Sequence, residues 1–305
     1  VAPVDLAAIL TTGEQQSREI MLQPHKQLIV ASYVPFHTQE EFTDTDFSSG
    51  VLIVLHDITK ERELIRIQQE FVANVSHELR TPLTTMKSYT ETLLGGAMYE
   101  PETCLSFLST MEKETERMVR LVKDLLALSQ LDYRQVAWRK ERMPLHELVT
   151  EVVNELRVKF GQERRTVTIT LPAEPVWLCF DRDKIKQVLI NIIQNAFKYT
   201  AAEGTIGVKL TADEQTARII VSDDGIGIPP EDVKRVFDRF YRVDKARSRD
   251  FGGTGLGLSI AREIVEAHGG SIALSSEADI GTEVQITLPL AGDEGVWACE
   301  NGSKQ

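Results

Sequence analysis

The segment VSHELRTPL, residues 75–83, places a histidine beside a carboxylate and a hydroxyl within an apolar helical pattern. In the frame of the neighbouring apolar residues His77 falls on the outer side of the helix, which leaves a plain surface histidine as the simplest interpretation. Its neighbours favour chemistry instead. Glu78 can accept a hydrogen bond from one imidazole nitrogen and leave the other as a nucleophile. The Thr81 hydroxyl, one turn further, can orient a water molecule.

Three clusters further along the chain have residue types that bind a nucleotide. In the first, Asn191, Asn195 and Lys198 share one helical face at spacings of four and three. An amide oxygen suits Mg²⁺ held between the protein and nucleotide phosphates, and the lysine can balance phosphate charge. A plain polar outer face of a helix explains this cluster equally well on its own.

The second cluster is SDDGIGIPP, residues 222–230, where a strand ends in two acids followed by alternating glycines. A buried Asp223 can accept a hydrogen bond from the amino group of adenine. Gly225 and Gly227 permit turns and close backbone approach. An acidic turn without function is the alternative.

The third cluster is FGGTGLGL, residues 251–258, a glycine-rich loop that opens into a helix whose N–H groups can cradle phosphates. Before it lies a basic segment, residues 236–250, which includes Arg239, Arg242 and Lys245. Such a segment is typical of a lid over phosphates, although a solvated charged loop has the same composition. The order of the clusters, with the outward histidine upstream, argues for a function more strongly than any cluster alone.

Two long amphipathic helices must position the histidine. A charged helical stretch begins at residue 60, and apolar residues then recur at steps of three and four from residue 72 to 93 and again from 108 to 129. GGAMYEP, residues 95–101, separates the two runs. This pattern predicts an antiparallel helical hairpin. Because a hairpin alone leaves its apolar seam exposed, we expect a homodimer that forms a four-helix bundle.

The remainder of the chain predicts an α+β multidomain protein. Residues 27–36 and 50–58 are expected to be strands of a partial β region. Beyond the hairpin, helices are expected at 147–160, 183–199 and 256–268, and strands at 165–171, 175–180, 204–210, 217–223, 270–276 and 282–290. These form an α/β sandwich. The expected domains are residues 1–59, 60–135 and 136–290, with a polar tail at 291–305.

Composition excludes some classes of function. The net charge of −12 disfavours binding of nucleic acid through phosphates, and no P-loop motif occurs. Cys104, Cys179 and Cys299 are widely spaced, so neither a disulfide framework nor a zinc site is expected. No apolar run approaches the roughly 20 residues of a membrane-spanning helix.

The motifs occur in the order that bacterial sensor histidine kinases use. SHELRTPL resembles the H-box of that family, NIIQNAFKY the N-box, DDGIGIP the first G-box, VFDRFYR the F-box and GGTGLGL the second G-box. Within that family, the chain resembles the WalK-type kinases of Gram-positive bacteria. HDITKERE, residues 56–63, is similar to the exit of a PAS sensor domain, although the segment before it is short for a complete PAS fold.

The resemblance implies an ATP-binding domain of the GHKL type and a role for each motif residue. His77 would accept the γ-phosphoryl group of ATP, Glu78 would act as base or orienter, and Thr81 would support dephosphorylation of a partner. Asn195 would bind Mg²⁺. The other nucleotide-binding residues would be Asn191, Lys198, Tyr199, Asp223, Gly225, Gly227, Ile228, Arg242, Lys245, Gly253, Thr254, Gly255, Leu256 and Gly257.

The resemblance also implies partners and a location. We expect phosphoryl transfer to an aspartate of a response regulator, and a homodimer that is the cytoplasmic portion of a protein of the inner or cell membrane. Three alternatives stay open: a phosphatase-dominant state, an ATPase of the Hsp90 or gyrase type, and a PAS-led binding module with a degenerate kinase. The product of ATP turnover, phosphohistidine or free phosphate, separates the kinase from the ATPase.

Overall fold

The computed structural model describes residues 6–24, 26–39, 47–132, 137–161, 164–243 and 253–290. The chain divides into two compact units, Val1–Ser76 and His77–Gln305. Helix α2 (Thr59–Leu94) begins in the first unit and ends in the second.

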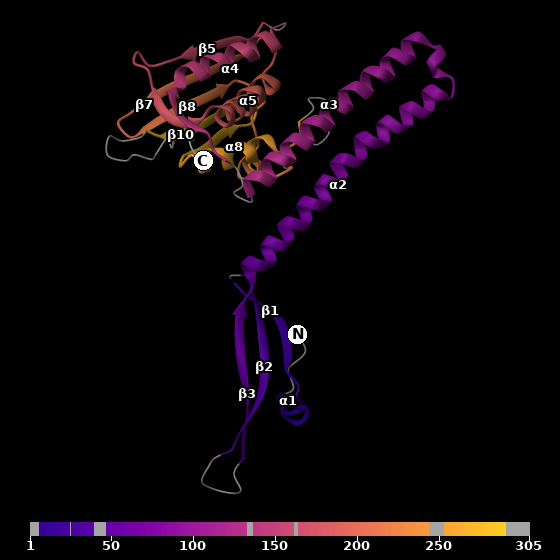
Figure 1. Ribbon diagram of the computed structural model, residues 1–305, viewed down its shortest axis with the longest axis vertical. Coiled ribbons are helices and arrows are strands. Elements are labelled where there is room, and N and C mark those ends of the chain that lie inside the picture. The colour runs from indigo at the N-terminus through magenta and orange to yellow at the C-terminus, as the bar shows by residue number, and fades with distance from the viewer. Residues whose placement is uncertain are drawn as a thin grey trace, which may run out of the picture. The chain divides into compact units, whose positions relative to one another are not determined.

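The first unit contains one antiparallel sheet in the order β1-β2-β3 (Figure 1). Its elements are α1 (Leu6–Thr12), β1 (Gln16–Leu22), β2 (Gln27–Gln39) and β3 (Phe47–Asp57). The two predicted strands correspond to β2 and β3. The segments α1 and β1 were not predicted, because QSREIML is largely polar and α1 has only seven residues. Ile9 of α1 packs against Ala31 and Tyr33 of β2 to form a small core.

The predicted helical hairpin is confirmed. Helix α2 is followed by the 3₁₀ turn η1 (Ala97–Tyr99) and by α3 (Pro101–Asp132). Gly96 in the turn has φ +127°, a conformation that favours glycine. The predicted seam stays open in a single chain, since Leu83, Leu108 and Val122 are 52%, 49% and 45% exposed. An exposed apolar face on both helices is what a bundle partner would cover.

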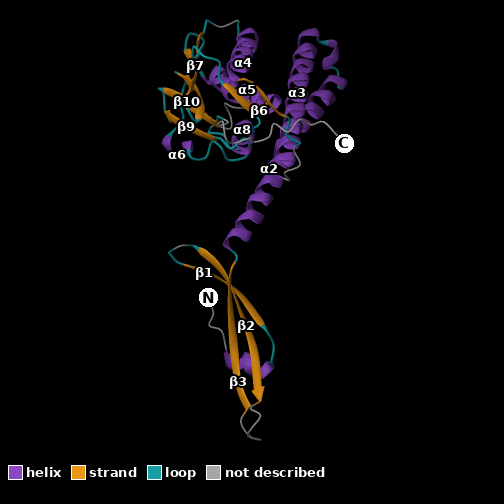
Figure 2. Cartoon of the chain, turned by 60° about the vertical axis from the view of Figure 1, so that its left-hand side comes forward, coloured by secondary structure: helices purple, strands orange, loops and turns teal. Residues whose placement is uncertain are grey.

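The predicted α/β sandwich is also confirmed. Its five-stranded sheet has the order β5-β7-β8-β10-β9 and is antiparallel except for the β5–β7 pair. The strands are β5 (Thr166–Thr170), β7 (Thr205–Ala212), β8 (Thr216–Asp223), β10 (Gly281–Pro289) and β9 (Ser271–Glu277). Helices α4 (Leu145–Phe160), α5 (Arg182–Tyr199) and α8 (Gly257–Ala267) lie on one side of this sheet (Figure 2). The core lies between the two layers.

A short two-stranded sheet precedes helix α5 in the sandwich. Strand β4 (Lys140–Pro144), which was not predicted, pairs with β6 (Trp177–Asp181). The ring of Trp138 meets the ring of His268 edge-on at 5.0 Å. The backbone N–H of Asp181 donates to Nε2 of His268 at 3.1 Å, so Nδ1 carries the proton and donates to the Ile264 carbonyl at 2.7 Å. The imidazole is therefore buried in its neutral form.

The burial of His268 predicts a loss of stability in mild acid. Burial lowers the pKa of His268 below its ordinary 6.5. Below pH 6.5 the unfolded chain therefore binds a proton that the folded chain resists, and stability is lost as pH falls through the lowered folded pKa. Urea unfolding at a series of pH values measures this loss. His268→Gln should flatten the pH dependence, and an unchanged slope in that variant would contradict the prediction.

The cysteines differ from one another. Cys104 is free, whereas Cys179 on β6 is disulfide-bonded. The expectation that no disulfide framework occurs rested on spacing along the chain, which carries no information on which thiols meet in the fold. Across the described residues, no helix combines the length and the apolar character needed to cross a membrane.

Candidate functional site

Helix α5 carries the first cluster. Its N-cap is Asp181, whose side chain accepts a hydrogen bond from the N–H of Lys184 at 3.1 Å. Its apolar face is buried in the core, which leaves the opposite face, with Asn191 and Asn195, partly exposed. Nδ2 of Asn191 donates to the carbonyl oxygen of Gly257 at 3.0 Å. This bond ties α5 to the first residue of α8, so the first and third predicted clusters meet.

Lys198, near the end of the same helix, lies in a positive environment. Burial lowers its pKa, and nearby positive charges lower it further. These charges belong to Arg120 of α3, Lys159 of α4 and Arg242. The negative charge of Asp124 acts in the opposite direction and raises the pKa of Lys198. A local group of cations within a chain of net charge −12 favours a compact anion such as phosphate.

The acidic glycine loop packs against the end of α5. Asp223 is the last residue of β8, and burial raises its pKa to about 6, opposed by hydrogen bonds from the N–H groups of Gly225 and Thr282. A Cβ on Gly225 would lie 2.5 Å from the carbonyl oxygen of Tyr199, which also accepts from the N–H of Ile226 at 3.3 Å. The close approach that this glycine permits is therefore to the protein's own backbone.

Two further residues of this loop belong to the predicted site. Gly227 has φ +62°, and a Cβ there would lie 1.9 Å from the carbonyl oxygen of Glu277. Ile228 is half-buried. Glycine is required at position 227 by packing against β9, whatever the loop binds.

The glycine-rich loop leads directly into α8. Gly255 has φ +75°, and its carbonyl oxygen accepts from the N–H of Phe240 at 2.9 Å. Leu256 is fully buried and anchors the loop, while Gly253 has open space around it. Gly257 is the first helical residue. Lys245 lies outside the described residues.

His77 is exposed on α2, and its imidazole makes no hydrogen bond or ion pair to any described residue. Glu78 does not bond to it. Its Oε2 instead accepts from Nη2 of Arg117 at 2.5 Å and from Nη2 of Arg242 at 3.1 Å. The Thr81 hydroxyl donates to the backbone carbonyl of His77 at 3.3 Å. Through Glu78 and Arg242, the histidine-bearing helix lies beside the nucleotide clusters.

Two further contacts join the hairpin to the sandwich. The Thr254 hydroxyl donates to Oδ2 of Asp124 on α3 at 2.8 Å. Arg239 donates to both carboxylate oxygens of Asp132 at 2.8 and 2.5 Å and to Glu263 of α8 at 2.6 Å. Neither of these two carboxylates of α3 was predicted as a site residue. The seven-residue spacing of Arg117 and Asp124, two helical turns, was the available signal that they share a face.

The residues fit a magnesium ion that is carried by a nucleotide. No group of three or more histidine, cysteine or acidic side chains that could hold a metal occurs among the described residues. Mg²⁺ bound with nucleotide phosphates needs only one or two protein oxygens. The amide of Asn195 is half-exposed and has no hydrogen bond within the described part of the chain, so its oxygen can serve as such a ligand.

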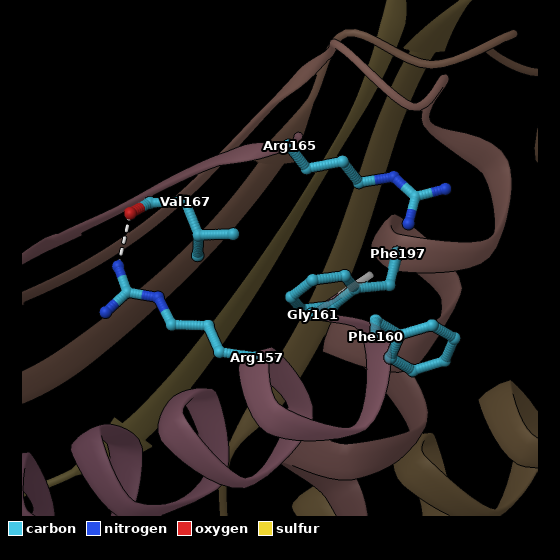
Figure 3. Close-up of a pocket in the computed structure, with 6 residues that line it drawn as sticks. All are labelled: Arg157, Phe160, Gly161, Arg165, Val167 and Phe197. Atoms are coloured by element: carbon cyan, nitrogen blue, oxygen red, sulfur yellow. Dashed lines mark hydrogen bonds between the residues drawn. The ribbon is translucent and has the colours of Figure 1, made fainter. Parts of the chain in front are cut away.

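A cavity of about 340 Å³ lies away from these clusters, between the end of α4, the start of β5 and α5 (Figure 3). Its lining contains none of the predicted site residues and consists of Arg157, Phe160, Gly161, Arg165, Val167 and Phe197. Arg157 donates to the Val167 carbonyl, and Arg165 donates to the Thr200 carbonyl at 2.9 Å. Both guanidinium groups thus hold the backbone in place.

Two family models match the chain. The His Kinase A (phospho-acceptor) domain matches residues 67–134, and the Histidine kinase-, DNA gyrase B-, and HSP90-like ATPase matches residues 180–292. The chain is 43% identical over 287 residues to the sensor protein kinase WalK of Staphylococcus epidermidis, covering 93% of this chain and 46% of that protein. It is 45% identical over 247 residues to the sensor histidine kinase WalK of Bacillus subtilis, covering 80% and 40%. The chain spans less than half the length of both relatives.

Solved structures agree on the fold. The histidine kinase AdeS of Acinetobacter baumannii matches with a TM-score of 0.56 and 26% identity, covering 70% of this chain and 98% of that one. The histidine kinase ThkA, solved in complex with the response regulator protein TrrA, matches with a TM-score of 0.63 over 95% of this chain and 83% of that one. At 24% identity this second likeness shows the fold alone.

Proposed function

Because the chain belongs to the sensor histidine kinases, we propose that it transfers the γ-phosphoryl group of ATP to His77. One observation carries the proposal. Helix α5, the Asp223 loop and the glycine-rich loop meet through the Asn191–Gly257 and Ile226–Tyr199 hydrogen bonds. Beside them lies the helix that bears an exposed histidine.

In the proposed reaction a neutral imidazole nitrogen of His77 attacks the γ-phosphorus. A P–N bond forms, the bond from the γ-phosphorus to the bridging oxygen breaks, and ADP leaves with that electron pair. Phosphoryl transfer depends on in-line placement and on charge neutralisation. Lys198 and Arg242 supply positive charge near the phosphates, and Asp223 accepts a hydrogen bond from adenine. Asn191, Tyr199, Gly225, Gly227, Ile228, Lys245 and residues 253–257 complete the proposed site.

Mg²⁺ would be held by Asn195 together with the nucleotide, where it neutralises phosphate charge. The free amide of Asn195 supports this role. No described residue forms a hydrogen bond with this amide, so turning it toward a cation breaks none of those contacts.

Labelling with γ-phosphate-tagged ATP and Mg²⁺ tests the proposed function. The expected label on the protein is labile in acid and stable in alkali, as a phosphohistidine is. ATP that is bound and hydrolysed to free phosphate without labelling the protein would favour the ATPase alternative. A chain that neither binds nor hydrolyses ATP would favour a binding module.

We also propose that the phosphoryl group passes to an aspartate of a response regulator, and that Thr81 supports hydrolysis of that phosphoaspartate. The exposed hydroxyl-bearing face of α2 beside His77 supports a docking site for the regulator there. Thr81→Ala should leave autophosphorylation of His77 intact and slow the loss of phosphate from the regulator, because the hydroxyl that orients water is gone.

The matched control is Thr84→Ala. Thr84 makes the same type of hydrogen bond, to the Arg80 carbonyl at 2.9 Å, but lies three residues further along α2. Phosphoregulator decay is measured for both variants. Equal decay rates in the Thr81 variant and the unchanged protein would contradict the phosphatase role.

We propose a homodimer for the full assembly, supported by the open apolar faces of α2 and α3. We further propose that β1–β3 belong to a PAS-like sensor region, supported by an antiparallel sheet that leads directly into α2. Membrane anchoring of the whole protein is proposed on the family resemblance alone.

A further inference from the structure

One face of α3 contacts the α/β sandwich, directly or through Glu78, by side chains that recur about every two helical turns. Arg117, Asp124 and Asp132 are seven and eight residues apart and so lie along one side of the helix. Arg117 binds Glu78, which in turn accepts from Arg242. Asp124 accepts from Thr254, and Asp132 accepts from Arg239. Leu121 and Leu128, on the same side, are buried.

Two of these contacts use the residues proposed above to hold phosphate. Arg242 and Thr254 are both engaged by carboxylate oxygens of the hairpin, those of Glu78 and Asp124. A carboxylate oxygen and a phosphate oxygen are the same kind of acceptor, anionic and able to take an N–H or O–H donor. Neither donor can serve the hairpin and a phosphate with the same hydrogen.

Of the two carboxylates, that of Asp124 lies closer to the start of α8 in its hydrogen-bond network. The Thr254 hydroxyl that donates to it also accepts from the backbone N–H of Leu256 at 3.3 Å, directly before α8. The carboxylate thereby lies beside the start of the 11-residue helix α8. Burial raises its pKa, and the hydrogen bond from Thr254 and the positive charge of Arg120, one turn earlier on α3, oppose that rise. A phosphate oxygen in its place would meet the same donor and the same cation.

We propose that Asp124 is a positioning residue that competes with nucleotide phosphate for Thr254. While Asp124 holds Thr254, the hydroxyl and the start of α8 are turned to the hairpin. Binding of the triphosphate breaks this hydrogen bond. The proposal rests on the proposed function, since it assigns Thr254 to the phosphate site. Asp124 itself touches neither the nucleotide nor His77.

The test is equilibrium binding of a non-hydrolysable ATP analogue with Mg²⁺ to the chain and to its Asp124→Asn variant. Asparagine keeps the size of the side chain and removes its charge, so the fold is preserved. The expected result is binding tightened by about fivefold, because the neutral amide oxygen is a weaker acceptor for the Thr254 hydroxyl than the carboxylate is. In turnover, KM for ATP should fall while kcat does not rise.

A double-mutant cycle shows whether the effect acts through Thr254. Asp124→Asn should have no effect on affinity in a Thr254→Val background and a full effect in a Thr254→Ser background, which restores the hydroxyl. Asp132→Asn is the matched control, because it breaks a contact of the same interface that does not involve Thr254. Its effect on affinity should be the same with and without the Thr254→Val substitution.

Each outcome decides the proposal. Unchanged or weaker binding by Asp124→Asn overturns it, and so does tightening that persists in the Thr254→Val background. If the unaltered chain binds no ATP analogue, the proposed function itself fails. If that chain binds the analogue and labels His77 but Asp124→Asn changes nothing, only the competition is refuted.

Discussion

His77→Gln is expected to reduce protein labelling from γ-phosphate-tagged ATP to background while leaving nucleotide affinity unchanged. Glutamine keeps a polar side chain of similar length but has no nucleophilic imidazole nitrogen. Because the imidazole of His77 is exposed and bonds to no described residue, its replacement leaves no buried group unpaired. The fold and the nucleotide clusters should therefore be unaffected. Acid-labile label and binding of an ATP analogue are measured on the same preparation.

His56→Gln is the matched control for this experiment. His56 is also exposed, on β3, and is not part of any nucleotide cluster. That variant should label as the unaltered chain does. Normal acid-labile labelling of His77→Gln would show that another residue accepts the phosphoryl group, and loss of nucleotide binding would show that the substitution acts on the fold.

Asp223→Asn is expected to weaken ATP binding by roughly 10- to 100-fold. A hydrogen bond to a charged acceptor contributes about 1.5–3 kcal/mol, and the amide presents an N–H₂ group where adenine offers its own. Asp224→Asn is the control. Asp224 is exposed, and its side chain accepts from the backbone N–H of Thr205 at 2.8 Å, so it supports the strand end only. Equal affinities of the two variants would refute the adenine assignment.

The same carboxylate predicts a pH dependence of binding. The pKa of Asp223 is raised to about 6 by burial, so its ionised form is lost as pH falls through about 6. Affinity for adenine nucleotides should fall over that range, because the neutral acid is a poorer acceptor. Titration of Asp223→Asn separates this effect from protonation of the nucleotide. A pH profile identical in both proteins would contradict it.

Local patterns predicted most of the fold. The three- and four-residue steps of α2 and α3 and the alternating strands β7, β8 and β10 all formed where their periodicity placed them. Strand β4 was missed because KERMP has no apolar alternation and depends on pairing with β6. The family resemblance is confirmed by two family models and by relatives of 43–45% identity.

The candidate site was predictable only as far as its motifs are continuous in sequence. The roles proposed for Asn195, Asp223 and Thr81 stay predictions. The partners of Glu78 were not predictable, because Arg117 lies 39 residues away and Arg242 lies 164 residues away. The contacts of Asp124 and Asp132 depend on how the hairpin packs against α8. No local pattern encodes that packing.

The contacts between α3 and the α/β sandwich determine how firmly the helical hairpin and the sandwich are held together. They combine a few polar contacts with the burial of Leu121 and Leu128. A hydrogen bond to a charged group contributes about 1.5–3 kcal/mol, and about 1.4 kcal/mol changes an equilibrium tenfold. Loss of one such contact would therefore favour separation of the hairpin from the sandwich by about tenfold or more. An interface held by few contacts of this strength depends on each of them.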